Sequence, residues 1–318
     1  MKMIKYLSRE LYLDFKILYE RTLNTIDWVL GSSNDFIILN VWLRHKHREY
    51  FKANWGDDLN EIVVSFLSER KVISYMWSFV SFFRPKNYMC IGSIVDTKTN
   101  RESIIWGSGA MYGDENIRIK KPYEVCAVRG PRTRRYLIDQ GINCPEIYGD
   151  PAIFLPFIYK REKLKKYKLG IIPHYIDYNL GNVQEFVAGN SDVAIINMKN
   201  YERWQDVVDL ICSCEFIASS SLHGIIISDS YNVPNIWIRL SNMVKGGDFK
   251  FLDYLEGCGR NVNSSPLDFS GKEINYALII ERMKEYKKPE YNLGELLRVC
   301  PFVSPSKLDL LNSQINGI

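Results

Sequence analysis

Short apolar runs alternate with helical segments along most of this chain, starting at about residue 36. The runs have the length of buried strands, and polar turns separate them from segments with helical spacing of apolar residues. The runs expected to form strands are 36–42, 88–91, 103–106, 123–128, 168–173, 193–197, 215–218 and 235–238. Strands that alternate with helices in this way favour parallel, doubly wound α/β sheets.

Several of the intervening segments carry helix signals. The stretch 59–67 places its apolar residues on one helical face, and Asp57 or Asp58 would cap that helix. Pro131 stands at the first position of a second helix, and Gly141 stands just beyond its end. The first 35 residues are expected to add helices in front of the first sheet.

The α/β pattern restarts after a break near residue 160. The segment 149–156 contains glycine and two prolines, and the charged run 160–166 follows it. We therefore expect two Rossmann-like domains that face a cleft, residues 1–158 with the added helices and residues 159–318. The pattern leaves open whether the last helices pack back on the N-terminal domain. Ligands of such sheets bind beyond the carboxyl ends of the strands.

Charge, cysteine content and missing motifs exclude several classes of protein. The net charge is only +4, without a long basic run, which disfavours nucleic acid as a partner. Neither a signal-peptide pattern nor a run of about 18 apolar residues is present, so we expect a cytoplasmic protein without a transmembrane helix. The seven cysteines include no CxxC pair and are expected to be reduced. HExxH, GxSxG and phosphate-loop motifs are missing, so neither a metal nor a cofactor is expected.

The stretch Ser219–Ser230 contains the strongest candidate for chemistry. The apolar run 215–218 ends at three serines, and His223 follows in the expected first turn of a helix. The serines are N-cap candidates, and a helix start offers backbone N–H groups that suit a phosphate or a carboxylate. His223 is either an acid–base group or a structural histidine on a loop, and both interpretations stay open. His45 and His47 lie in a basic loop and are not proposed as site residues.

Further candidates lie at other expected strand ends. Arg129 ends a strand, and Arg132 follows it at a helix start. Cations there oppose the helix dipole, so these two either bind an anionic ligand or are simply solvated. The segments Asn54–Asp57 and Gly107–Gly109 offer short polar groups and glycines, and His174 follows another strand.

Taken in order, these motifs resemble the polysaccharide pyruvyl transferase family. The segments that carry the resemblance are Asn54–Asn60, Trp106–Gly109, Val128–Arg134, Gly149–Ala152, Ile171–Tyr175, Ser219–Gly224 and Gly247–Tyr254. Their order and spacing hold over roughly residues 36 to 260, and Cys300–Phe302 resembles the closing segment of the family. Each motif alone is weak, but seven in order make a specific match.

The resemblance implies a two-domain fold similar to that of GT-B glycosyltransferases. It also implies transfer of an enolpyruvyl unit from phosphoenolpyruvate to two hydroxyls of one sugar, which yields a pyruvate ketal and phosphate. The acceptor would be a polysaccharide or a lipid-linked oligosaccharide precursor, as in exopolysaccharide or capsule synthesis, and peripheral association with a membrane is compatible with it. Phosphoenolpyruvate is a co-substrate in this chemistry, which requires no cofactor.

The resemblance also suggests a role for each candidate residue. His223 would be the acid–base catalyst, acting first as a base because a helix start disfavours imidazolium. Asp57 would assist at an acceptor hydroxyl or would only cap its helix. Some family members carry arginine where this chain has Ser221, and Arg132 or Lys250 would replace that charge. The expected donor-binding residues are Arg129, Arg132, Ser220, Ser221 and Leu222, and the expected acceptor-binding residues are Asn54, Gly107, Ser108, Gly109, His174 and Lys250.

Two other functions stay open on the sequence. A GT-B glycosyltransferase that uses a nucleotide sugar would share the architecture, but it needs a carboxylate for the ribose, for which Asp229 and Glu256 are the candidates. A catalytically inactive glycan-binding protein would share the fold alone, and the presence of His223 and Arg129 argues against it. Sugar-dependent release of phosphate from phosphoenolpyruvate, with a nucleotide sugar as control, separates the three functions.

Overall fold

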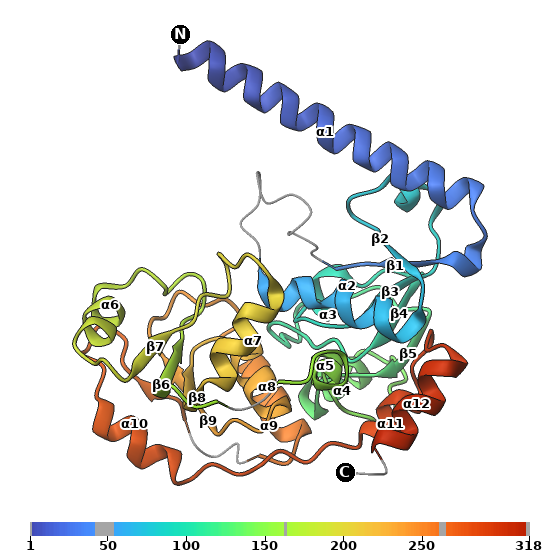
Figure 1. The fold of residues 1–318 in the computed structure, drawn as a ribbon. Helices are drawn as coiled ribbons and strands as arrows, with labels where there is room; N and C mark the ends of the chain where they lie inside the picture. The colour runs from blue at the N-terminus through green and yellow to red at the C-terminus, as the bar shows by residue number, and fades with distance from the viewer. Residues whose placement is uncertain (1, 42–53, 162–163, 261–264, 316–318) are drawn as a thin grey trace.

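The computed structural model describes residues 2–41, 54–161, 164–260 and 265–315 (Figure 1). His45, His47 and the last residue of the expected strand 36–42 lie outside the described residues. The described part contains two α/β halves, each built on a parallel five-stranded sheet. This confirms the predicted α/β class with two parallel sheets.

The first half holds the strands up to residue 127. They are β1 (Phe36–Leu39), β2 (Lys71–Ser74), β3 (Asn87–Met89), β4 (Ser103–Trp106) and β5 (Glu124–Ala127), in the order β2-β1-β3-β4-β5. Its helices and 3-10 turns are η1 (Ser33–Asp35), α2 (Trp55–Ser68), η3 (Phe79–Phe83), α3 (Val95–Lys98), α4 (Pro131–Ile138), η4 (Pro151–Phe154) and α5 (Leu155–Ile158). The apolar stripe expected over 59–67 is the buried face of α2, which covers the sheet.

The second half repeats this plan. Its strands are β6 (Tyr167–Ile172), β7 (Val193–Ile195), β8 (Cys214–Ser219), β9 (Asn235–Arg239) and β10 (Leu267–Asp268), in the order β10-β9-β8-β6-β7. Its helices are α6 (Gly181–Ala188), α7 (Trp204–Cys212), α8 (Leu222–Ser230), α9 (Phe249–Gly257) and α10 (Tyr276–Met283). Helix α8 is almost wholly buried, because its Ile225–Ile227 run has no polar face to offer to solvent.

The two sheets share one strand order. Numbered from its own first strand, each sheet reads 2-1-3-4-5, because β6 and β8 occupy in the second sheet the places of β1 and β3 in the first. In this doubly wound order successive strands are added on opposite sides of the first strand, so the strand order reverses between the first and third strands. Ligands bind at that switch point, beyond the carboxyl ends of the strands. The expected ligand-binding loops are therefore those after β1 and β3 in the first sheet and those after β6 and β8 in the second.

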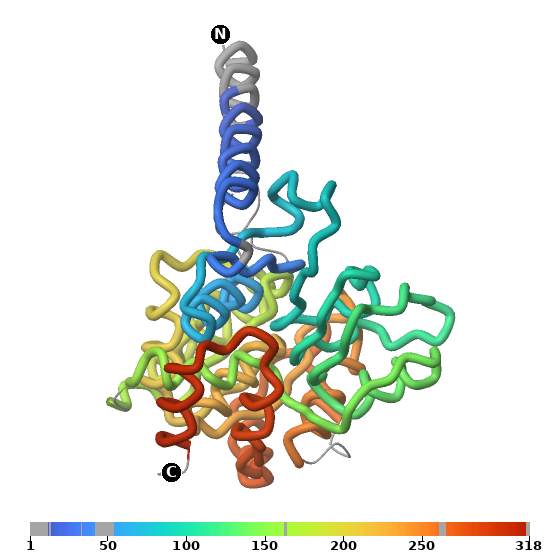
Figure 2. Tube along the Cα trace, turned by 90° about the vertical axis from the view of Figure 1, so that its right-hand side faces the viewer, coloured from blue at the N-terminus to red at the C-terminus, as the bar shows by residue number. Residues whose placement is uncertain are grey.

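Three further helices complete the chain. They are α1 (Lys2–Leu30), α11 (Leu293–Arg298) and α12 (Pro305–Ile315). Residues 12–30 of α1 project from the body in both views and contact it through η3 (Figures 1 and 2). The last two helices return to the first half: Trp106 Nε1 donates to the Leu296 carbonyl at 2.9 Å, and Ser304 N donates to the Leu67 carbonyl at 2.8 Å. This answers the question that the sequence left open about the C-terminal helices.

A single large cluster of buried apolar side chains continues from the first half into the second. At the junction, Trp55 of α2 donates from its backbone N–H to the Met198 carbonyl and from its indole to the Trp204 carbonyl, both at 2.9 Å. The start of α2 is therefore positioned by the second half of the chain. The proposed boundary at residue 158 stays a prediction, as do the cleft and the GT-B-like arrangement.

Candidate active site

The start of α2 brings polar groups of the first half to the junction. The helix begins at Trp55 with Asn54 as its N-cap residue, so the prediction that Asp57 or Asp58 caps it was wrong. Both carboxylates lie in the first turn of the helix. The Asn54 side chain makes no capping bond, and its Nδ2 donates to Asp57 Oδ2 at 2.7 Å. A helix without a side-chain cap leaves backbone N–H groups of its first turn for other partners.

The start of α8 is also without a side-chain cap. Ser221 is the N-cap residue and makes no capping bond with its side chain, and the helix begins at Leu222. Ser219 shapes the turn, since its Oγ accepts from the Ser221 N–H at 3.0 Å and donates to the Ser221 carbonyl at 2.8 Å. The N-cap prediction for the serines is thus correct in position, whereas the hydrogen bonding leaves the first-turn N–H groups for a ligand.

Ser220 ties the two switch-point loops of the second half together. Its Oγ accepts from the backbone N–H of His174 at 2.8 Å and donates to Asp177 Oδ2 at 3.2 Å. His174 itself uses Nδ1 to accept from the Ile176 N–H at 3.4 Å. Ser220 and His174 lie near each other because β6 and β8 pair, and the hydroxyl of Ser220 is engaged within the protein.

The two helix starts meet at His223. A Cβ added at Gly56 would lie 1.9 Å from Nδ1 of His223 and 2.3 Å from its Cγ, so the imidazole lies directly against the α2 backbone. The Nε2 atom is shielded from solvent and has no hydrogen-bond partner among the described residues. Asp57 follows Gly56 directly in the chain, and its Oδ1 would lie 3.5 Å from a Cβ added at Gly92. The structure therefore brings His223 and the Asn54–Asp57 segment together across the junction.

Arg129 lies inside this junction, fully buried. Its Nε donates to Asp253 Oδ2 at 3.0 Å, its Nη2 donates to the Ala110 carbonyl at 2.8 Å, and its Nη1 donates to Ser93 Oγ. The guanidinium packs flat on Gly109, where an added Cβ would lie 2.2 Å from Cζ. Arg129 therefore supplies fixed positive charge to the site, and its predicted direct contact with a donor stays a prediction.

Gly107 and Ser108 lie beneath the site. A Cβ at Gly107 would lie 2.3 Å from Cδ of Pro151, and its φ of +89° is one that favours glycine. Ser108 is fully buried and donates from Oγ to the Cys90 carbonyl at 2.9 Å. Gly107 packs against Pro151, and the Ser108 carbonyl accepts from the Arg129 N–H, so their predicted contact with an acceptor stays a prediction without support from their surroundings.

Arg132 is placed differently from Arg129. Its Nε pairs with Glu256 Oε2 at 2.9 Å, and both side chains are about one-third exposed, at 33% and 35%. It lines a cavity of about 530 Å³ together with Arg118 and Arg135, on the outer side of α4 and α9. The structure therefore separates Arg132 from the groups that surround His223, and its predicted donor contact is left unsupported.

Replacing Arg129 with alanine is expected to destabilise the fold by about 3–5 kcal/mol, because it strands the buried Asp253 carboxylate without its cation. The matched change Arg132→Ala is expected to cost about 1 kcal/mol or less, since that pair is solvent-exposed. Urea unfolding of both variants measures the difference. Equal losses of unfolding free energy would show that the Arg129–Asp253 pair does not hold the junction.

Asp253 is the residue of this site to which sequence reasoning assigned no role. Beyond its pair with Arg129, it accepts from Thr133 N at 2.8 Å and from Thr133 Oγ1 at 2.7 Å. A Cβ at Gly130 would lie 1.8 Å from the Asp253 carbonyl, so α9 and the start of α4 are in close contact. The only sequence signal was its place in the Gly247–Tyr254 motif.

Lys250 completes the charge distribution of the site. It is 7% exposed, and its Nζ donates to the Lys245 carbonyl at 2.9 Å. Burial and the charge of Arg129 lower the pKa of Lys250 to about 8, while Asp57 acts in the opposite direction. Lys250 is thus protonated at neutral pH. It lies close enough to Asp57 and Arg129 for their charges to shift its pKa.

Both histidines of the site are neutral at pH 7. Burial, with smaller contributions from Arg129 and Lys250, lowers the pKa of His223 to about 3. Burial followed by the charges of Lys250 and His223 lowers the pKa of His174 to about 3 as well. The cationic side chains and the two helix starts of the site suit an anionic ligand. The neutral imidazole of His223, whose Nε2 has no partner among the described residues, is suited to act as a base.

Comparison with known proteins identifies the family of the chain. A family model described as polysaccharide pyruvyl transferase matches residues 54–242, a range that contains Asn54 and His223 but ends before Lys250 and Asp253. The uncharacterized protein L143 of Acanthamoeba polyphaga mimivirus is 30% identical over 214 residues, which cover 65% of this chain and 71% of that protein. Succinoglycan biosynthesis protein ExoV of Rhizobium meliloti (strain 1021) is 25% identical over 214 residues, covering 65% of this chain and 62% of ExoV.

Proposed function

This chain belongs to the polysaccharide pyruvyl transferase family, and we propose that it transfers the enolpyruvyl unit of phosphoenolpyruvate to two hydroxyls of one sugar in a polysaccharide or its lipid-linked precursor. The product would be a pyruvate ketal with release of phosphate. The observation that carries the proposal is the unpaired Nε2 of a neutral His223 at the meeting point of two helix starts. We further propose that the two halves are arranged as in GT-B enzymes, with both substrates between them.

The donor would bind at the start of α8. Phosphoenolpyruvate carries a phosphate and a carboxylate, and a helix start with nearby cations suits both groups. Lys250 and Arg129 supply these cations, and no acidic residue lies in the first turn of α8. The first turn of α2 contains Asp57 and Asp58, which repel an anion, so the acceptor hydroxyls fit better on that side.

Proton transfer would then divide between two groups. Neutral His223 accepts the proton of the attacking sugar hydroxyl, whose oxygen bonds to the central carbon of the donor, while the protonated Lys250 delivers a proton to the methylene carbon, which becomes a methyl group. The second hydroxyl attacks the same carbon, the bond from that carbon to the phosphate oxygen breaks, and phosphate leaves with the proton of the second hydroxyl. Proton exchange with solvent then removes the first proton from His223 and restores the proton of Lys250. Asp57, two residues before Leu59 on the same helix start as Gly56, would hydrogen-bond an acceptor hydroxyl.

The proposal is tested by measuring phosphate release from phosphoenolpyruvate with a panel of nitrophenyl glycosides. Release that depends on a glycoside, together with a glycoside of increased mass, supports pyruvyl transfer. Release of nucleotide from a nucleotide sugar, with no phosphate from phosphoenolpyruvate, would favour a glycosyltransferase. Binding of glycosides without any turnover would indicate an inactive glycan-binding protein.

The kcat/KM for phosphoenolpyruvate is expected to fall as the pH rises through about 8, because Lys250 then loses its proton and its charge. Arginine keeps its proton to a pH above about 12. In Lys250→Arg the alkaline decline should therefore move to higher pH, whatever activity is retained. Initial rates between neutral and alkaline pH measure this, and an unchanged decline in the variant would exclude Lys250 as its source.

The nucleotide-sugar alternative loses one of its candidate ribose carboxylates. Asp229 is buried, accepting from Arg260 Nη1 at 2.8 Å and from Tyr254 OH at 2.9 Å. Glu256, the other candidate, pairs with Arg132. Asp229 is thus engaged in buried structural contacts, which leaves Glu256, in a partly exposed ion pair, as the candidate for a ribose carboxylate.

A further inference from the structure

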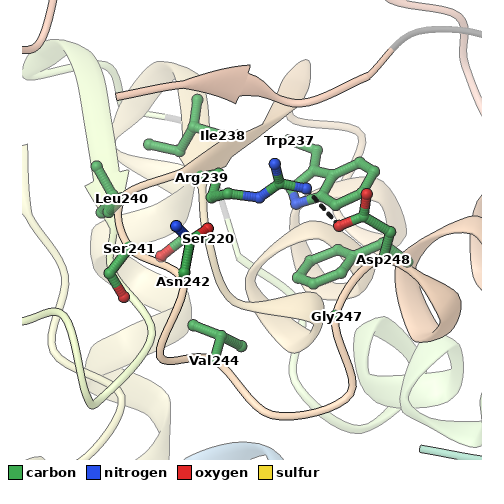
Figure 3. A pocket seen from close by; sticks show the side chains of 11 residues that line it. Ser220, Trp237, Ile238, Arg239, Leu240, Ser241, Asn242, Val244, Gly247 and Asp248 are labelled. Carbon is green, nitrogen blue, oxygen red and sulfur yellow. Dashed lines mark hydrogen bonds and ion pairs between the residues drawn. The ribbon is translucent and has the colours of Figure 1, made fainter. Parts of the chain in front are cut away.

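A second cavity lies beside the candidate active site, beyond the carboxyl end of β9. Its volume is about 260 Å³, and the residues that line it include Ser220, Arg239, Ser241, Asn242, Asp248 and the aromatic pair Trp237 and Phe251. Figure 3 shows Arg239 reaching across the pocket to Asp248, with Trp237 behind it and the segment 241–248 curving around it. Ser220 connects this pocket to the candidate active site, because it also belongs to the turn before His223.

The charged groups that line this pocket neutralise one another. Of the described residues that line it, Arg239 alone is basic, and its guanidinium is shared between Asp248, which lines the pocket, and Asp268, which does not. A third carboxylate lies behind the wall: Asp177 accepts from the hydroxyls of Ser220 and Ser241. Because the one basic side chain of the lining is already paired with two carboxylates, the pocket does not favour the phosphate and carboxylate groups of phosphoenolpyruvate.

The remaining features suit an uncharged polyhydroxyl ligand. Trp237 stacks on Phe251 with ring centroids 4.5 Å apart and planes at 10°, which gives the pocket a rigid aromatic wall. Asp248 and Asn242 offer hydrogen-bond acceptors and donors beside this wall. An apolar wall with a few convergent polar groups is typical of pockets that bind small neutral molecules.

We propose that this pocket is a subsite for a neutral sugar ring of the acceptor glycan, next to the sugar that is modified at His223. The inference rests on the proposed function, and it adds a specificity determinant outside the reacting centre. The two substrates would be sorted by charge, with the anionic donor on the Lys250 side of Ser220 and the neutral glycan on the Asp248 side.

Two carboxylates of the same ion-pair cluster provide a matched test. Asp248 and Asp268 both bond Arg239, and their side chains are 46% and 40% exposed, but only Asp248 lines the pocket. We expect Asp248→Asn to weaken binding of a nitrophenyl disaccharide about tenfold, and Asp268→Asn to leave it unchanged within about twofold. Affinities would be measured by calorimetry over a panel of nitrophenyl mono- and disaccharides, with phosphoenolpyruvate as the second ligand.

The outcomes separate this subsite from the proposed function. A loss confined to Asp248→Asn, larger for disaccharides than for monosaccharides and absent for phosphoenolpyruvate, supports the subsite. Equal effects of both variants, no effect of either, or no binding of any glycoside to the native protein would overturn it. If the sugar-binding difference is found while phosphoenolpyruvate is never turned over, the pyruvyl transfer proposal fails and the sugar pocket stands.

Discussion

Gly56→Ala is expected to remove nearly all turnover while leaving the protein folded. The added methyl carbon would lie 1.9 Å from Nδ1 of His223, a separation that forces the imidazole out of its place. A catalytic group displaced by about 1 Å loses on the order of 10²-fold in rate. Alanine favours a helix more than glycine by roughly 1 kcal/mol, so α2 itself gains from the change.

Gly294→Ala provides the control for this prediction. Gly294 is the second residue of α11, as Gly56 is of α2, and nothing lies within 4 Å of a Cβ added there. We expect Gly294→Ala to keep wild-type activity and stability. Steady-state rates and thermal unfolding of both variants give the comparison. Wild-type turnover in Gly56→Ala would mean that the contact between the two helix starts does not position the catalyst.

His223→Ala is expected to lower kcat by about 10² to 10⁴, the contribution typical of a positioned acid–base group. Its Nε2 bonds to nothing in the described part of the chain, so the change removes no hydrogen bond made by that atom. The unfolding free energy should therefore change by only about 1 kcal/mol. His223→Gln should be equally inactive, because an amide is a far weaker base than an imidazole.

A structural role for His223 predicts a different pattern. In that case His223→Ala would retain more than about a tenth of the wild-type kcat, and stability rather than turnover would respond to the substitution. Comparing kcat with urea unfolding for His223→Ala and His223→Gln distinguishes a catalytic from a packing role.

Most of the sheet architecture could be predicted from the alternation of apolar runs. The strand expected over 103–106 matches β4 residue for residue, and the run expected at 215–218 lies inside β8. The strands that escaped prediction are those with a weak pattern: β2 has only two apolar residues, after a lysine, and β10 is two residues long. Both are edge strands, which have a neighbouring strand on one side only and therefore need fewer apolar residues.

The site was predictable in its parts but not in its contacts. The order of the motifs placed Asn54–Asp57 and His223 at helix starts, and the repeated strand order brings those helix starts to two facing switch points. The partner of Arg129 could not be read from the sequence, because Asp253 is 124 residues away and an arginine at a helix start looks the same whether it is solvated or buried. Burial of that pair depends on close packing between Gly130 and the Asp253 backbone, which is a tertiary effect.

Pyruvyl transfer at the junction of the two halves is tested most directly by following an isotopic label. Phosphoenolpyruvate labelled at its central carbon would be incubated with the protein and an accepted glycoside, and the product examined by NMR. The account predicts a labelled ketal carbon bonded to two oxygens of one sugar, one phosphate released for each ketal, and both products formed at least about 10²-fold more slowly with His223→Ala. Label found only in free pyruvate, or ketal formation that persists in His223→Ala at the wild-type rate, would contradict it.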